Sequence, residues 1–215
     1  MKESYLSVQG MAENTIVIER SKFICTLREV ADEEAAKQFI AGMRKTHSLA
    51  THNCYAYIAD EIGNVMKYSD DGEPQGTAGM PMLEVLKNRK IMKTAAVVTR
   101  YFGGIKLGAG GLVRAYAESV SKALDSARIV ENRLVKTGLL KLTYDQYPKM
   151  LQFLEREQAV VERTDYTDEV SLALSVPCGE YAAFTARLTD YFAGKVSLAE
   201  GETHYAAFAE GAWRS

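Results

Sequence analysis

A glycine-rich segment between residues 97 and 114 has the clearest chemical potential in the chain. β-branched residues lead into five glycines, and an apolar helical pattern follows them. Glycine lets the backbone turn tightly and lets a ligand approach it closely. The first amides of a helix have no intrahelical acceptor and lie at the positive end of the helix dipole. This arrangement is typical of loops that cradle phosphate or another anion.

The charges around this segment favour the same chemistry. Between residues 87 and 117 the chain has seven Lys or Arg residues and no Asp or Glu. The alternative is that the glycines only build a tight strand-to-helix connection. Neither a P-loop nor a dinucleotide-binding glycine spacing is present, so no particular nucleotide or cofactor is indicated. We predict a phosphate- or nucleic-acid-binding surface made by Lys22, Arg100, Lys106, Gly108, Gly110, Gly111 and Arg114.

An acidic loop precedes this segment. Asp70, Asp71 and Glu73 are three acids within four residues, and their carboxylates could ligate a cation. Glycine and proline at positions 72 and 74 do not fit a calcium-binding loop of the EF-hand type. We favour a polar turn that caps the next helix, with Asp70, Asp71 and Gln75 as possible support for the anion surface. No metal site is predicted.

Two histidines and three cysteines give weaker signals. His47 and His52 are five residues apart, which does not place them on one helix face, and a metal pair would need a partner such as Asp70. Structural or surface histidines are the favoured interpretation. No serine or cysteine lies in a recognisable nucleophile motif, so no catalytic residue is predicted.

Composition sets limits on the class of protein. The 215 residues are 47% hydrophobic and 25% charged, which is an ordinary globular balance. The net charge of −2 excludes a strongly basic, histone-like binder. Three widely spaced cysteines with no C-x-x-C pair indicate a reducing compartment. We find no apolar signal segment and no run of about 20 apolar residues, and we therefore expect a cytoplasmic protein without membrane insertion.

The elements that must position these residues form two parts. Residues 1–130 have 17 basic and 15 acidic residues, whereas residues 131–215 have 9 and 13, so a boundary near residues 131–136 is expected. The first part alternates strands (15–19, 22–27, 54–59, 65–68 and 94–102) with helices (32–44, 80–88 and 110–127). The second part has the order βαββαβ of a ferredoxin-like domain, with strands at 139–144, 159–164, 170–176 and 196–205 and helices at 147–158 and 180–192.

Several spaced motifs resemble the IMPACT family, and in particular its bacterial, YigZ-type branch. They are residues 20–24 (RSKFI), 52–57 (HNCYAY), 70–74 (DDGEP), 79–83 (GMPML) and 97–108 (VVTRYFGGIKLG), together with Ile91. The resemblance implies an α+β protein. An N-terminal βαβ domain with a left-handed crossover, similar to domains of a ribosomal protein and elongation factor G, would span residues 1–132. A ferredoxin-like domain would span residues 136–208.

The resemblance also bears on function, because eukaryotic relatives regulate translation. We expect a non-enzymatic protein that binds RNA, the ribosome or a translation-related protein through the basic glycine loop. The alternative is a phosphate- or nucleotide-handling enzyme that uses the same loop, with Asp70 or Asp71 holding Mg²⁺. A metal hydrolase that uses the two histidines, and a protein adaptor without an anion site, are less favoured.

Overall fold

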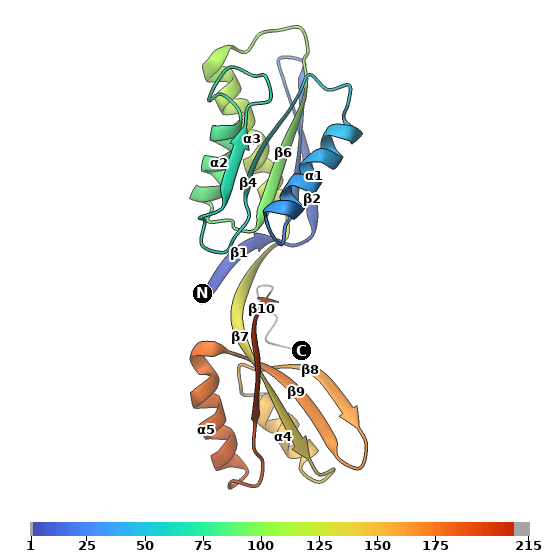
Figure 1. The fold of residues 1–215 in the computed structure, drawn as a ribbon, viewed down its shortest axis with the longest axis vertical. Coiled ribbons are helices and arrows are strands. Elements are labelled where there is room, and N and C mark those ends of the chain that lie inside the picture. The colour runs from blue at the N-terminus through green and yellow to red at the C-terminus, as the bar shows by residue number, and fades with distance from the viewer. Residues whose placement is uncertain (1, 209–215) are drawn as a thin grey trace. The chain divides into compact units, whose positions relative to one another are not determined.

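The computed structural model describes residues 2–208, which divide into two compact units (Figure 1). The N-terminal unit is Ser4–Glu131, and the C-terminal unit begins at Asn132, within strand β7 (Ile129–Leu142). In this described part the protein is α+β, as expected, with two antiparallel sheets and five α-helices. None of its helices is both long and apolar enough to cross a membrane.

The N-terminal unit is a five-stranded sheet covered by helices on both faces. Its strand order is β2 (Met11–Ile18), β3 (Ser21–Glu29), β6 (Thr94–Tyr101), β4 (His52–Ile58) and β5 (Met66–Ser69), and neighbouring strands are antiparallel. Helices α2 (Gly79–Asn88) and α3 (Gly108–Ser126) pack on one face, and α1 (Glu33–Thr46) packs on the other (Figure 1). Because both faces are covered, β6 is buried almost throughout and shows no polar alternation.

The C-terminal unit has the predicted βαββαβ order. After β7 come α4 (Tyr147–Leu154), β8 (Val160–Tyr166), β9 (Val170–Pro177), a short 3-10 helix η1 (Cys178–Glu180), α5 (Tyr181–Tyr191) and β10 (Ala199–Phe208). β9 and β10 both pair with β7, and β8 pairs with β9, so the first and third strands of this order are central; β1 (Ser4–Val8) is a fifth strand of the same sheet and also pairs with β7. This is the ferredoxin-like arrangement. One apolar core, which includes Phe153 and Phe184, lies between this sheet and the two helices.

Three elements differ from the sequence predictions. Strand β7 begins at Ile129 rather than at residue 139, because charged residues such as Arg133 and Lys136 interrupt the apolar alternation of its first half. The division between the two units, at residues 131 and 132, therefore lies inside this strand. Strand β1 (Ser4–Val8) was not predicted. Helix α4 also ends earlier, at Leu154 instead of residue 158.

Candidate anion-binding site

A cavity of about 430 Å³ lies at the start of α3 in the N-terminal unit. Its walls come from the start of β4, the acidic loop before α2, the end of β6 and the first turn of α3. The lining residues are Thr51, His52, Glu73, Pro74, Arg100, Phe102, Lys106, Leu107, Gly108, Ala109 and Leu112. We call this the α3 cavity. The glycine-rich segment and the acidic loop, which are about 30 residues apart in sequence, therefore meet at one place.

Strand pairing explains why these segments meet. His52 on β4 is the direct antiparallel partner of Arg100 on β6. Side chains alternate between the two faces of a strand, so Arg100 lies on the same face as Val98, which packs in the core under α2 and α3. The short loop from β6 to α3 then brings Lys106 to the same end of the sheet (Figure 1).

Glycines in this loop have different structural roles. A Cβ at Gly103 would lie 2.1 Å from the carbonyl carbon of Arg20 in the β2–β3 turn, so only glycine fits there. Gly104 and Gly108 have φ values of 86° and 69°, which other residues rarely adopt. At Gly110 the space is open, because the nearest atom to an added Cβ is Arg114 Nη1 at 3.8 Å.

The start of α3 presents unsatisfied backbone donors beside the cavity. Leu107 is the N-cap residue, and no side chain caps this end of the helix. The amides of Gly108, Ala109 and Gly110 therefore have no intrahelical acceptor. The 19-residue helix also directs the positive end of its dipole to this place. Gly111 has another role, since an added Cβ would lie 3.0 Å from Leu107 Cβ in the first turn.

A buried ion pair forms the floor of the site. Arg100 Nη1 lies 2.6 Å from Glu73 Oε1, and the two side chains are 6% and 4% exposed. The hydroxyl of Tyr116 on α3 donates to the same carboxylate oxygen at 2.7 Å. The Arg100 guanidinium lies 5.3 Å and 5.4 Å from the ring centres of Phe23 and Phe102. Aromatic faces attract a cation at such distances, so these contacts hold the guanidinium in place.

Arg100 thus differs from the surface cation that the sequence suggested. Its charge is already compensated by Glu73, because strand pairing places the residue inside the unit rather than at its rim. The buried Nε atom of Arg100 has no hydrogen-bond partner among the described residues. An unpaired buried N–H is costly.

The acidic loop is a structural turn. Asp70 Oδ1 accepts hydrogen bonds from the amides of Ala78 and Gly79, at 3.0 and 2.9 Å, where α2 begins. Asp71 pairs with Arg44 at 2.7 Å and accepts from the Asn53 amide. Both carboxylates are therefore engaged with protein groups. Within residues 2–208, no three His, Cys, Asp or Glu side chains are grouped to hold a metal ion. Gln75 is exposed.

The two histidines lie in different environments. His52 Nδ1 is 2.8 Å from the carbonyl oxygen of Asp71, so this nitrogen carries a proton and donates it. His52 Nε2 lies 3.8 Å from Glu73 Oε2. His47 instead follows α1, on the other face of the sheet, and its Nδ1 contacts the Tyr101 hydroxyl at 3.0 Å. The structure therefore does not bring the two imidazoles together.

Burial keeps the Cys54 thiol and the Tyr116 hydroxyl, which lie beside the site, protonated. Burial is the main cause that raises the pKa of the Cys54 thiol to about 12, with the nearby carboxylates adding to it. The pKa of Tyr116 is raised far above its usual range, mainly by burial and then by Cys54 and Glu73. Cys54 is accordingly a thiol and not a nucleophilic thiolate near neutral pH. Tyr116 remains a hydroxyl that donates to Glu73.

The other predicted cations are distributed over separate surfaces. Lys22 is exposed and pairs in register with Tyr101, so alternation places its side chain on the α1 face. Arg114 is exposed on α3, with its Nη1 near Gly110, and neither residue lines the cavity. The remaining four basic residues of the acid-free segment lie at the opposite end of β6, about 25 Å away at roughly 3.3 Å per residue. They are Lys87, Arg89, Lys90 and Lys93.

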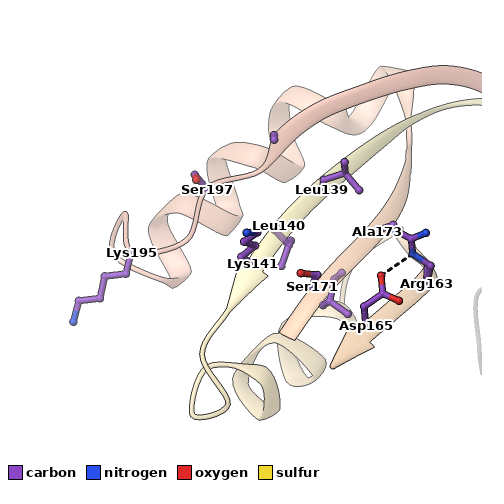
Figure 2. Close-up of a pocket in the computed structure, with 11 residues that line it drawn as sticks. Leu139, Leu140, Lys141, Arg163, Asp165, Ser171, Ala173, Lys195 and Ser197 are labelled. Carbon is purple, nitrogen blue, oxygen red and sulfur yellow. Dashed lines mark ion pairs between the residues drawn. The ribbon is translucent and has the colours of Figure 1, made fainter. Parts of the chain in front are cut away.

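A second cavity, not anticipated from the sequence, lies on the outer face of the C-terminal sheet (Figure 2). We call it the sheet cavity, and its volume is about 520 Å³. Lys141 and Lys195 line it together with an exposed ion pair between Arg163 and Asp165, whose atoms are 2.8 Å apart. Polar residues that alternate with the core leucines of β7 are ordinary for a half-exposed strand, so no sequence signal marks this cavity.

Comparison with known proteins supports the family resemblance. Residues 19–124 match the Impact N-terminal domain, and residues 140–195 match a domain of unknown function (DUF1949). The chain is 45% identical to IMPACT family member YvyE of Bacillus subtilis, over 95% of this chain and 94% of that protein. It is 36% identical to IMPACT family member YigZ of Escherichia coli, over 84% and 90% of the two chains.

A solved structure also matches most of the chain. It is described as a crystal structure of a hypothetical protein, and it covers 94% of this chain and 99% of its own, with a TM-score of 0.61 and 34% sequence identity. Both units of the fold therefore have relatives in the same order along one chain. On this evidence the chain belongs to the IMPACT family.

Proposed function

We propose that this protein is a non-enzymatic, translation-associated regulator that binds phosphate groups of RNA, free or in the ribosome, at the α3 cavity. The observation that carries the proposal is the uncapped start of α3, whose first residues line the α3 cavity together with Lys106. Members of the IMPACT family are known as translation-regulatory proteins, which agrees with an RNA partner.

The phosphate contacts divide between a floor and the cations around it. The amides of Gly108, Ala109 and Gly110 form the floor. Lys106, which lines the cavity, and Arg114, whose Nη1 lies near Gly110, supply the positive charge around it. Exposed cations add salt-dependent attraction without reading sequence. With so few cations we expect modest affinity that falls steeply as salt is added.

An exposed aromatic side chain favours a single strand over a duplex. The ring of Phe102 lines the cavity, and the residue is 47% exposed. Bases of single-stranded nucleic acid stack on exposed aromatic rings whatever their identity. A duplex keeps its bases stacked inside and could use only the phosphate donors.

Titration of a fluorescent single-stranded oligoribonucleotide at two salt concentrations tests the proposal. We expect weaker binding at high salt, and Lys106→Gln and Arg114→Glu should each weaken binding at low salt. Lys87→Gln, at the other end of the sheet, is the matched control and should bind like the unaltered chain. Binding that is absent, or that ignores salt and both variants, would reject the proposed function.

A phosphate- or nucleotide-handling enzyme is the second candidate, and one observation favours it. His52 lines the α3 cavity with its proton fixed on Nδ1, so its Nε2 has a lone pair that could accept a proton. Asp70 and Asp71 are already occupied and could not hold Mg²⁺ without rearrangement. Turnover of a nucleoside triphosphate that is lost in His52→Gln would favour this candidate, and no turnover would remove it.

A further inference from the structure

The α3 cavity contains an unused acceptor as well as unused donors. Oxygen Oε1 of Glu73 accepts from both Arg100 and Tyr116. Oxygen Oε2 has no donor within hydrogen-bond distance among the described residues, because His52 Nε2 lies 3.8 Å away. The glutamate side chain is only 4% exposed, and Glu73 lines the α3 cavity.

His52 does not supply the missing hydrogen bond. Its Nδ1 donates to the Asp71 carbonyl oxygen. Its Nε2 lies 3.8 Å from Glu73 Oε2, which is beyond hydrogen-bond distance. A donor group from a ligand would fill this gap. Phosphate at neutral pH is chiefly an acceptor and does not meet that need, so the donor must come from another part of the ligand.

We infer that the α3 cavity takes one ribonucleotide unit of single-stranded RNA, with a sugar hydroxyl donating to Glu73 Oε2. The phosphate lies at the start of α3, and the base stacks on Phe102. The 2′-hydroxyl is the group by which a protein distinguishes RNA from DNA. A volume of about 430 Å³ falls in the range of small-ligand sites, which suits one nucleotide. This inference rests on the proposed function and names the ligand of the same site.

The side chains that form the proposed site are held in place before a ligand binds. Arg100 contacts both the carboxylate and the Phe102 ring, with its Nη1 2.6 Å from Glu73 Oε1 and its Cζ 5.4 Å from the ring centre. It therefore links the proposed hydroxyl acceptor to the proposed stacking surface. Side chains that are held before binding lose little freedom on binding, which favours selectivity in a small site.

Competition between matched ligands tests the inference. An oligoadenylate and an oligodeoxyadenylate of equal length displace a fluorescent oligoribonucleotide from the full chain. We expect the ribose form to bind roughly tenfold more tightly, as a hydrogen bond to a buried carboxylate gives. In Glu73→Gln this ratio should fall towards one, because the glutamine amide donates to His52 and removes the charged acceptor. Circular dichroism and thermal unfolding show whether this variant folds.

A second variant and a second ligand pair keep the test decisive if Glu73→Gln does not fold. Phe102→Ala alters an exposed ring, and it should weaken both ligands by about fivefold or more while leaving their ratio unchanged. Adenosine 5′-monophosphate and its 2′-deoxy form need no variant and should show the same preference. Equal, salt-dependent binding of ribose and deoxyribose forms overturns this inference and leaves the proposed function standing. Failure of every nucleic-acid ligand to bind overturns both.

Discussion

The α3 cavity and the sheet cavity each contain an arginine–carboxylate pair, but in opposite environments. Arg100 and Glu73 have side chains that are 6% and 4% exposed, whereas Arg163 and Asp165 are 71% and 50% exposed. In water an ion pair gains little, since solvent screens both charges. In a protein interior each charge depends on the other, because neither has water to replace its partner.

The difference in burial between the two ion pairs indicates which cavity is better suited to bind a ligand. Arg100 is held by a carboxylate and two aromatic rings, and it retains one donor without a partner. Lys141, Lys195 and Arg163 at the sheet cavity are exposed to solvent, which already satisfies them. A ligand there must displace that water and order flexible side chains. The comparison therefore favours the α3 cavity over the sheet cavity as the proposed binding site.

The largest predicted effect follows from breaking the buried pair. Glu73→Ala leaves Arg100 charged and buried without a counter-ion. We expect the free energy of unfolding to fall by about 3–5 kcal/mol, measured by urea denaturation followed by circular dichroism. Glu84→Ala, which breaks an exposed pair with Lys87 in the same unit, is the control. A loss no larger than that of the control would mean that water solvates Arg100.

A second prediction concerns the backbone that supports each cavity. At Gly103 an added methyl group would meet the backbone of Arg20 at 2.1 Å, so Gly103→Ala must displace the loop that carries Lys106. At Gly138 it would meet the Leu198 side chain at 2.5 Å, and a side chain can shift. We expect Gly103→Ala to lower the melting temperature by an amount equivalent to about 1–3 kcal/mol, with a smaller change for Gly138→Ala. Equal effects would show that the β2–β3 turn yields as easily as a side chain.

The buried thiols give a pH-dependent prediction. Because the folded-state pKa of Cys54 is about 12, above the ordinary value of 9.0, its stabilising contribution is complete below pH 9. That contribution is lost as the pH rises towards 12, with about 1 kcal/mol lost between pH 9 and 10. At pH 8 a thiol reagent should label the partly exposed Cys178 and spare Cys25 and Cys54. Labelling of Cys54 at the rate of Cys178 would contradict its burial.

The sequence predicted the helices and strands better than it predicted which of them pair in the sheet. The N-cap at Asp32 is confirmed, with Asp32 accepting from the Ala35 amide at 2.8 Å. The βαββαβ order of the C-terminal unit is also confirmed, because period, caps and turns are local signals. The register that makes His52 the partner of Arg100 joins residues 48 positions apart, and no local pattern encodes it.

The same limit explains the mistaken picture of the charges. All seven charged residues between positions 87 and 117 are basic. Strand β6 runs across the sheet in this segment and so separates four of them from the other three. Arg100 resembles a surface cation in sequence and is buried in the fold. Glu73 was not singled out for the site, since nothing distinguishes it locally from the capping Asp70.

The smallest predicted effect belongs to the exposed pair. Asp165→Ala removes the partner of Arg163 at the sheet cavity, and solvent then hydrates the arginine. We expect the free energy of unfolding to change by less than about 0.5 kcal/mol, and less still in high salt. A loss of several kcal/mol here would remove the contrast between the two cavities.

Mapping of the bound surface tests the central claim most directly. Amide NMR signals of the full chain are followed while a single-stranded oligoribonucleotide is added. We predict that the signals of Gly108, Ala109 and Gly110 shift in proportion to saturation, while those of Lys141 and Lys195 at the sheet cavity do not move. Shifts confined to the sheet cavity, with the α3 amides unchanged at saturation, would contradict the account.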